Sequence, residues 1–488
     1  MNKYLKAISH NLIFFAINTL AFLILTPMAI RIMGDEFFGL WTILFAVAQF
    51  ANIGTLGIGS IINKFASENN CTDSKASSIL SSALIIILPM AFVTIFIIFV
   101  FRNVLVDTIN PSLTYIFQFK VALTICTLSI IPQFINKIFQ GYFLSQLKNK
   151  FVRTMEFISS IFPLIGGLLI TIFEKNLVWL SAWNLFIQIA IFFIFMATAT
   201  RSIRLKWTPK ITTLKRMLGF STFMFLESSA ITLFQQFDRV LVGMTLGSVA
   251  AGVYTVATSV GLRLSIITGQ ATEVIIPYAS LKNSLGENEV LYQIFRKLSK
   301  YISLMIAGLA GLSIIWMREI LAIWISPEYA TTNSNIFCVL ILAYGFLSLY
   351  RPAHQTLTGL GLVKFTSLSY LFASVLMLTS LFFLSHRFGL NGAAYANGVM
   401  VILLAMNLRT YKILNKKLDW RHAFADLKWG MLMPIIAYLV ILTNAPWYYR
   451  AGYSLLLGAL VYIKLNKDTF IKSQIGQITQ RSTLEKEA

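Results

Sequence analysis

Charged residues are scarce in this chain. Only 12% of its 488 residues are Asp, Glu, Lys or Arg, whereas 57% are hydrophobic, and the mean hydropathy is +0.74. A soluble protein of ordinary composition has about 25% charged residues. The scarcity of charge therefore excludes a cytosolic enzyme, a secreted disulfide scaffold and a disordered chain, and it predicts a protein embedded in a lipid bilayer.

Cysteine and phosphate-binding motifs are also nearly absent. The three cysteines, Cys71, Cys126 and Cys338, form no CxxC pair and have no histidine cluster nearby, so we expect neither a zinc site nor a disulfide framework. No Gly-x4-Gly-Lys-Ser/Thr loop occurs, which argues against an ATP-driven pump. We therefore expect no bound cofactor and no metal site.

Long apolar segments make up most of the chain. A helix needs about 20 mostly apolar residues to cross the hydrocarbon core of a bilayer, and the sequence predicts fourteen such helices joined by short connections. The first seven are expected at Asn11–Ile32, Phe37–Ile62, Ile79–Phe101, Leu113–Ile138, Phe157–Phe173, Val178–Thr198 and Leu218–Met244. The last seven are expected at Val249–Pro277, Leu298–Trp324, Ile336–Thr358, Phe365–Ser385, Leu390–Leu408, Leu427–Leu442 and Trp447–Ile463.

Basic residues outnumber acidic residues by 40 to 19, which gives a formal net charge of +21. With a cytoplasmic amino terminus, 30 basic residues fall in cytoplasmic segments, six in outer segments and four inside predicted helices. Such an imbalance between the two sides is the positive-inside pattern. We therefore expect both termini in the cytoplasm, and the charge needs no nucleic-acid partner to explain it.

The sequence contains an internal repeat. The segment from Gly34 through Gly39 to Thr42 recurs 213 residues later, from Gly247 through Gly252 to Thr255. Each copy opens a long helix, and we expect a hairpin turn before it. Because six predicted helices separate the copies, both have the same orientation, which predicts two parallel lobes around a site near the membrane midplane.

Several short motifs resemble one known family. They are the Gly34-x4-Gly39-Leu-Trp hairpin with Gly54, Gly57 and Gly59 in the next helix, the sequence Gln236-Phe-Asp-Arg239, the sequence Gly252-Val-Tyr254, and the sequence Gly389-Leu-Asn-Gly-Ala-Ala394. Together with fourteen helices, they resemble the polysaccharide-export branch of the multidrug/oligosaccharidyl-lipid/polysaccharide flippase superfamily. The chain looks like a Wzx-type flippase for O-antigen or exopolysaccharide repeat units.

This resemblance implies an all-α integral membrane protein with two six-helix lobes around a central cavity and two extra C-terminal helices. We expect the lobes at residues 1–210 and 211–415, the extra helices at 416–465 and a cytoplasmic tail at 466–488. The implied cargo is undecaprenyl-pyrophosphate carrying a short oligosaccharide, moved by alternating access across the bacterial inner membrane for lipopolysaccharide or exopolysaccharide synthesis. Glycosyltransferases and a polysaccharide polymerase are the implied protein partners.

Four basic residues lie inside predicted helices, where an exposed charge costs about 2.5–3.5 kcal/mol. Arg263, halfway along its helix, is the strongest candidate for binding a pyrophosphate in the cavity, and Arg351, Lys120 and Arg239 are further candidates. Structural alternatives exist: Lys120 has the reach to extend to the lipid headgroups, and Arg239 has Asp238 beside it.

Two acidic residues, Glu227 and Asp238, lie on one predicted helix. Their spacing of eleven residues is close to three turns, so an uninterrupted helix would place both on one face. We expect them either to couple transport to protons or sodium or, in the case of Glu227, to pair with Arg263.

Two other functions remain open from the sequence alone. One is a drug or cation antiporter of the same superfamily, although such a protein would be expected to carry acidic residues in its cavity. The other is a membrane glycosyltransferase or polymerase, although the chain lacks the sizeable extramembrane segment typical of those enzymes.

Overall fold

The computed structural model describes residues 2–49, 55, 57–66, 73–146, 148–203, 206–272, 275–415 and 420–466. Side chains are described over the same ranges except for 2–13, 60, 64, 219–228, 277, 281, 284, 465 and 466. Within these ranges all regular secondary structure is helical. The tail that we expect at 466–488 lies outside the described residues except for its first position.

The helices fall into three groups along the chain. The first group is α1 (Asn2–Met33), α2 (Asp35–Gln49), α4 (Ile58–Ala66), α5 (Asp73–Ile109), α6 (Leu113–Leu128), α7 (Ile130–Ser145), α8 (Asn149–Phe173) and α9 (Leu177–Ser202). The second begins with α10 (Ile211–Thr232), the π-helical segment η1 (Leu233–Phe237), α11 (Asp238–Leu246), α12 (Ser248–Thr272), α13 (Ile275–Ser284) and α14 (Asn288–Ile315). It continues with α15 (Met317–Trp324), α16 (Pro327–Ser348), α17 (Arg351–Gly359), α18 (Val363–Ala396), the 3-10 segment η2 (Asn397–Leu404) and α19 (Ala405–Asn415). The third is α20 (Trp420–Leu442) and α21 (Trp447–Asn466).

The fold class predicted from the sequence is confirmed, and the count of fourteen spans is approximate. Ten helical stretches of the described chain are long and apolar enough to cross a membrane. One of them, Val363–Asn415, has 53 residues, which at 1.5 Å per residue is about 80 Å, more than twice the hydrocarbon core. Gly389, with φ 58° and ψ −140°, interrupts this stretch. It therefore holds two of the predicted spans.

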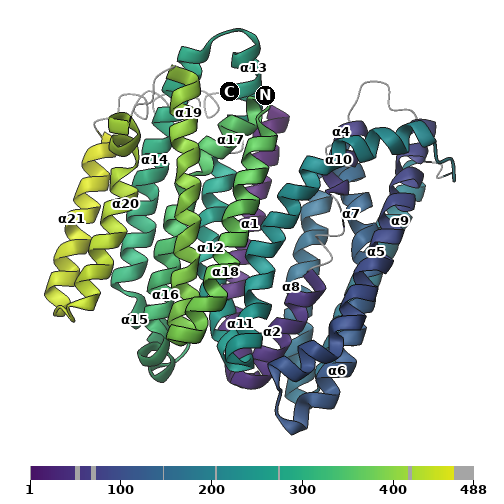
Figure 1. Cartoon of the computed structure of the whole chain (residues 1–488), viewed down its shortest axis with the longest axis horizontal. Coiled ribbons are helices and arrows are strands. Elements are labelled where there is room, and N and C mark those ends of the chain that lie inside the picture. Colours follow the sequence, from purple (N-terminus) through teal and green to yellow (C-terminus); the bar gives the residue numbers. More distant parts are fainter. Residues whose placement is uncertain are drawn as a thin grey trace, which may run out of the picture.

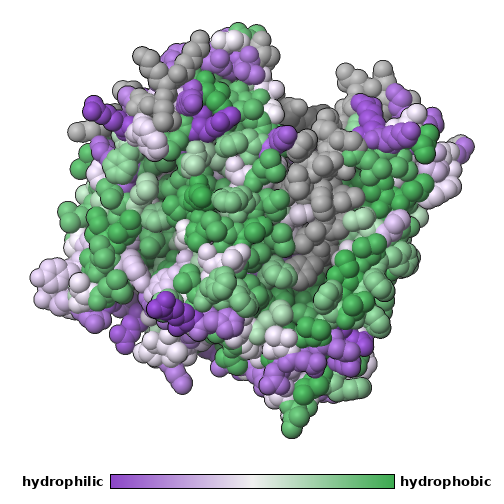
Figure 2. Space-filling model, viewed as in Figure 1, coloured by the Kyte–Doolittle hydropathy of each residue, from purple (hydrophilic) through white to green (hydrophobic). Residues whose placement is uncertain are grey.

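The surface has the polarity that a bilayer requires. In Figure 2 hydrophobic residues cover the middle of the visible face, and hydrophilic residues gather at its two ends. Large apolar side chains such as Phe96 and Phe383 are 67% and 65% exposed, which would be costly in water and is expected for side chains that face lipid. The chain is therefore a multi-pass membrane protein.

Two bundles stand side by side (Figure 1). In the first, α1 packs along α8, α4 along α7 and α6 along α9; in the second, α12 packs along α16 and α10 along α18. The non-helical residues 206–210 connect α9 to α10. In Figure 1 the bundles approach each other at the end where α15 lies, and we call this the α15 end and the opposite one the α13 end.

The C-terminal pair is attached to the second bundle through a buried carboxylate. Asp426 on α20 has a fully buried side chain and lies 2.8 Å from Arg296 and 3.5 Å from Lys300, both on α14. The hydroxyl of Tyr411 on α19 donates to the same carboxylate at 2.5 Å. Three helices are thus held by one ionic and hydrogen-bonded cluster.

The repeat in the sequence corresponds to two equivalent turns. Gly34 between α1 and α2 has φ 79°, and Gly247 between α11 and α12 has φ 87°, a conformation that glycine adopts without strain. The predicted hairpins are therefore confirmed. The second glycines of the two copies meet: a Cβ on Gly39 would lie 1.9 Å from the carbonyl oxygen of Ser248, and one on Gly252 would lie 3.2 Å from the Cα of Gly39. The repeat thus brings α2 and α12 into backbone contact across the bundles.

Other contacts join the bundles at the same α15 end. The guanidinium of Arg31 on α1 donates two hydrogen bonds to the carbonyl of Ile325, one of them 3.1 Å long. The indole of Trp324 on α15 donates to the carbonyl of Leu23 on α1 at 2.5 Å. The α15 end is therefore closed in this conformation.

Candidate functional site

Two successive pockets lie between the bundles, against α1, α8 and α12. The first, which we call the vestibule, has a volume of about 330 Å³ and the second, the inner pocket, about 140 Å³. The vestibule is lined by Phe14, Phe15, Asn18, Thr19, Arg153, Glu156, Ser160, Arg263, Ile266 and Gln270. The inner pocket is lined by Phe22, Thr26, Phe38, Trp41, Thr42, Phe45, Leu164, Arg239, Thr255, Val256 and Ser259.

The order of the lining residues shows how the pockets are arranged. Along α1 the vestibule uses positions 14–19 and the inner pocket 22–26, and along α12 the vestibule uses 263–270 and the inner pocket 255–259. The vestibule therefore lies nearer the α13 end, because α13 follows the end of α12. The inner pocket lies between the vestibule and the closed α15 end.

Arg263 occupies the junction of the two pockets. It lines the vestibule, while its guanidinium carbon lies 3.6 Å from the ring centroid of Phe22, which lines the inner pocket. Its Nη1 donates a 2.7 Å hydrogen bond to the carbonyl of Ser259, one turn earlier on α12. Because a cation–π contact uses the face of the guanidinium, the N–H groups at its edge remain available to a ligand.

Arg239 brings a second cation to the inner pocket. It follows η1, the five-residue π-helical segment, and a π segment changes the direction in which the next side chains point. Its neighbours in the lining include the aromatic residues Phe38, Trp41 and Phe45 on α2. The two arginines therefore reach the cavity from the second bundle, and the aromatic side chains reach it from the first.

The cavity contains polar atoms without partners. Within the described part of the chain, the Nε atoms of Arg239 and Arg263, the Oε1 of Gln270 and the Oγ1 of Thr255 are buried and have no hydrogen-bond partner. Leaving such an atom unpaired costs about 1–3 kcal/mol, more for a charged group. Neither arginine forms an ion pair with a described carboxylate. The arrangement is therefore suited to binding an anionic group that accepts hydrogen bonds.

The structure does not bring the other two predicted cations to these pockets. Arg351 on α17 donates to the hydroxyl of Ser265 at 3.0 and 3.2 Å, and Ser265 lies two positions from Arg263, on the opposite face of α12. Lys120 lies on α6, one turn before Thr124, which accepts a 3.0 Å hydrogen bond from Arg102 on α5. No residue of α6 or α17 lines the vestibule or the inner pocket.

Of the two predicted acidic residues, Asp238 is separate from the pockets, since it lines neither the vestibule nor the inner pocket. Asp238 has no exposed surface, and its Oδ1 accepts a 2.7 Å hydrogen bond from the backbone N–H of Arg239. The side chain of Glu227 lies outside the described residues. Because η1 interrupts the α-helix between these two positions, the expectation of a shared face, which assumes an unbroken helix, does not apply.

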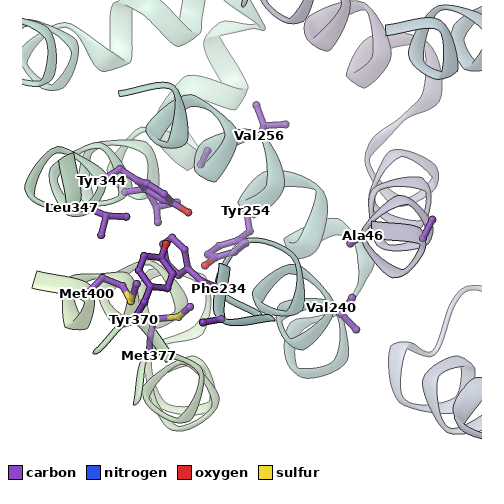
Figure 3. Close-up of a cluster of buried hydrophobic side chains, with 14 of the residues drawn as sticks. Ala46, Phe234, Val240, Tyr254, Val256, Tyr344, Leu347, Tyr370, Met377 and Met400 are labelled. Atoms are coloured by element: carbon purple, nitrogen blue, oxygen red, sulfur yellow. The ribbon is translucent and has the colours of Figure 1, made fainter. Parts of the chain in front are cut away.

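Asp238 follows Phe234 by one turn and thus belongs to the interior of the second bundle. Figure 3 shows this region, in which Tyr254, Tyr344 and Tyr370 gather around Phe234. The ring of Phe234 lies 5.7 Å from that of Tyr344 and 6.1 Å from that of Tyr370. The aromatic cluster packs the bundle and is distinct from the vestibule and the inner pocket.

Some cavity residues were not predicted from the sequence. Phe22 is one of 40 phenylalanines, and no local pattern distinguishes it. Arg153 was assigned to a cytoplasmic connection, whereas α8 begins at Asn149, eight residues before the predicted start of that span. The spacing of Arg153 and Glu156, oppositely charged and three apart, is a signal for these two extra helical turns, and the two side chains do form a 2.7 Å ion pair.

Comparisons with known proteins agree with this architecture. The family described as "Polysaccharide biosynthesis protein" matches residues 5–281, more than half of the chain. A Shigella flexneri protein named "Putative O-antigen transporter" is 23% identical over 406 residues, which are 82% of this chain and 95% of that protein.

Solved structures share the fold. The lipid II flippase MurJ in an inward closed conformation aligns over 95% of this chain and 100% of its own, with a TM-score of 0.70 and 15% identity. A multidrug resistance MATE family transporter of the MOP superfamily, in an inward-facing conformation, aligns over 86% of this chain and 95% of its own, with a TM-score of 0.64 and 12% identity. At these identities the likeness establishes the fold.

Proposed function

Because the chain belongs to the polysaccharide biosynthesis protein family, we propose that it moves undecaprenyl-pyrophosphate-linked oligosaccharide repeat units across the bacterial inner membrane by alternating access. Like its relatives, the chain is a membrane transport protein and not an enzyme. A polymerase or glycosyltransferase activity is therefore excluded. The name of the Shigella flexneri relative supports an O-antigen type of cargo.

The observation that carries the proposal is the pair of arginines in the cavity between the bundles, neither of which forms an ion pair with a carboxylate that the structure describes. Among the described residues, the Nε atoms of Arg263 and Arg239 have no hydrogen-bond partner, and a pyrophosphate offers several oxygens that a guanidinium binds in a fork. A cation antiporter would be expected to place acidic groups here. Glu156, the carboxylate that lines the vestibule, is paired with Arg153.

The proposed orientation places both termini in the cytoplasm, so the vestibule opens toward the cytoplasmic side and the α15 end faces outward. Lipid-linked repeat units made by glycosyltransferases would enter the vestibule and be released to an external polymerase. Outward movement of about two negative charges is favoured by roughly 4–5 kcal/mol at an inside-negative potential of 100 mV.

Binding of undecaprenyl pyrophosphate to the purified protein in lipid nanodiscs tests the proposal. We expect Arg263→Gln to weaken binding about 10- to 150-fold, because a hydrogen bond to a charged group contributes about 1.5–3 kcal/mol. The matched control is Arg387→Gln, because Arg387 is an exposed arginine on α18, two residues before the break at Gly389. In cells, Arg263→Gln should make lipid-linked repeat units accumulate on the cytoplasmic side. Equal affinity in wild type and Arg263→Gln would refute the pyrophosphate site.

A further inference from the structure

The vestibule and the inner pocket differ in chemistry. The inner pocket combines hydroxyl groups with four aromatic side chains, whereas the vestibule has two aromatic side chains and is the pocket that contains amides. Each wall of the vestibule contributes an uncharged hydrogen-bonding group: Asn18 and Thr19 from α1, Ser160 from α8 and Gln270 from α12. Amides and hydroxyls both donate and accept, as do the hydroxyl groups of a sugar. The vestibule therefore matches a carbohydrate better than a lipid tail.

The charges that line the vestibule, apart from Arg263 at its junction with the inner pocket, cancel each other. The Nη1 of Arg153 lies 2.7 Å from the Oε2 of Glu156, and both side chains are 35% exposed. An acidic sugar bound here would have to compete with Glu156 for Arg153 and would place its carboxylate near another carboxylate. An uncharged sugar meets no such opposition.

Gln270 is a vestibule side chain with unused hydrogen-bonding capacity among the described residues. Asn18 is already engaged, because its Oδ1 accepts from the hydroxyl of Ser160 at 3.0 Å and its Nδ2 donates to the carbonyl of Phe14 at 3.2 Å. The Oε1 of Gln270, by contrast, is buried and has no partner among the described residues. Gln270 lies seven positions after Arg263, two turns along the same face of α12.

From these observations we infer that the vestibule is a subsite for one uncharged sugar, the first of the glycan, and that Gln270 recognises it. The inference rests on the proposed function, because Arg263 must hold the pyrophosphate to which this sugar is attached. Gln270 then lies about 10 Å further along α12 toward the α13 end, on the side from which the glycan enters. Glu156 excludes an acidic sugar by keeping Arg153 occupied.

Three lipids test the subsite on the full-length protein in nanodiscs: undecaprenyl pyrophosphate, the same lipid bearing one N-acetylhexosamine, and the same lipid bearing one hexuronic acid. We expect the wild type to bind the N-acetylhexosamine form most tightly. Gln270→Leu should weaken binding of that form about five- to tenfold, the effect of losing one or two neutral hydrogen bonds, and leave the sugar-free lipid unaffected. Gln270→Ala is a second variant in case the leucine disturbs folding.

Gln293→Leu is the matched control, because Gln293 is exposed on α14 and bonds to Glu289 at 2.8 Å. It should change none of the three affinities. Glu156→Gln should raise the affinity for the hexuronic acid form at least fivefold, because it removes the carboxylate that repels the acidic sugar and competes with it for Arg153.

The inference is overturned if Gln270→Leu weakens all three lipids equally, if it leaves the N-acetylhexosamine form unchanged, or if the wild type prefers the acidic sugar. Failure of the proposed function looks different: the wild type then binds none of the three lipids, or Arg263→Gln binds the sugar-free lipid as well as the wild type does.

Discussion

The contact between the two repeat glycines gives the most direct test of how this transporter opens. Gly39 on α2 faces the backbone of Ser248 at the start of α12, and a Cβ at position 39 would lie 1.9 Å from that carbonyl oxygen and 2.4 Å from its carbon. The obstacle is backbone, so no side-chain rotation can relieve it. Gly39→Ala therefore forces α2 and α12 apart at the α15 end.

The size of the effect follows from this geometry. A Cβ needs more than 3.0 Å of separation from such an atom, so the helices must move apart by about 1 Å or more. Overpacking of this kind costs about 1–3 kcal/mol. In a protein that alternates between two conformations, that energy shifts their ratio about 5- to 150-fold. The shift favours the conformation in which the α15 end is open, because only the closed state contains the contact.

Pulsed electron paramagnetic resonance can measure this shift in a variant without native cysteines. Spin labels at Leu113 and Ile323, which are 91% and 85% exposed, report the distance between the bundles at the α15 end. We expect the longer distance to gain population in Gly39→Ala. Gly252→Ala, whose Cβ would lie 3.2 Å from Gly39, should do less. Gly308→Ala, with nothing within 4 Å, should have no effect. An unchanged distance distribution in Gly39→Ala would contradict this account of closure.

Three further predictions concern other contacts of the structure. Phe22→Leu should weaken binding of undecaprenyl pyrophosphate about two- to fivefold, because it removes a cation–π contact of about 0.5–1 kcal/mol that positions Arg263; titration in nanodiscs measures this, and an unchanged affinity would exclude the positioning role. Asp426→Ala should destabilise the fold by about 3–5 kcal/mol, since its partners on α14 and α19 lose a buried carboxylate; thermal unfolding should show a lowered midpoint, and a midpoint equal to wild type would refute it. Arg31→Ala should open the α15 end, because it removes the two hydrogen bonds to the carbonyl of Ile325. A membrane-impermeant thiol reagent should then label an introduced Ile323→Cys faster. Equal labelling rates with and without Arg31→Ala would contradict a role of these hydrogen bonds in closing the α15 end.

The fold was largely predictable because membrane insertion imposes strong rules on a sequence. Apolar runs of fixed length mark the spans, and a 213-residue repeat marks two related halves. Breaks within spans were harder to predict. The turn at Gly57, with φ 67°, and the π segment at Leu233–Phe237 depend on how neighbouring helices satisfy the backbone groups. Hydropathy does not reveal either feature, so the predicted spans Phe37–Ile62 and Leu218–Met244 run across them.

The sequence predicted that buried basic residues would form the candidate site, but it did not show which of them line the cavity. The cost of burying a charge singled out Arg263, and the structure places it between the bundles. The same reasoning also selected Arg351. Hydropathy indicates how deep a residue lies in the membrane, but it does not show in which direction around the helix its side chain points. Direction around α12 is set by packing: Ser265 faces the second bundle and receives Arg351, while Arg263 faces Phe22 of the first. The sequence contains the spacing of two residues on one helix, but it does not show which neighbouring helices each of them faces.

This difference in direction has a mechanistic consequence. Arg263 contacts α1 across the boundary between the bundles, and α1 is also the helix that reaches Trp324 and Ile325 at the closed α15 end. The ring of Phe22 lies 3.6 Å from the guanidinium carbon of Arg263 and 6.0 Å from the centroid of Trp324. Because one ring contacts both groups, we expect a ligand that draws Arg263 away from Phe22 to alter the packing of Trp324 as well. In the proposed alternating-access cycle, cargo binding and release of the α15 end would then act on the same side chain, so the cargo could shift the balance between the two conformations.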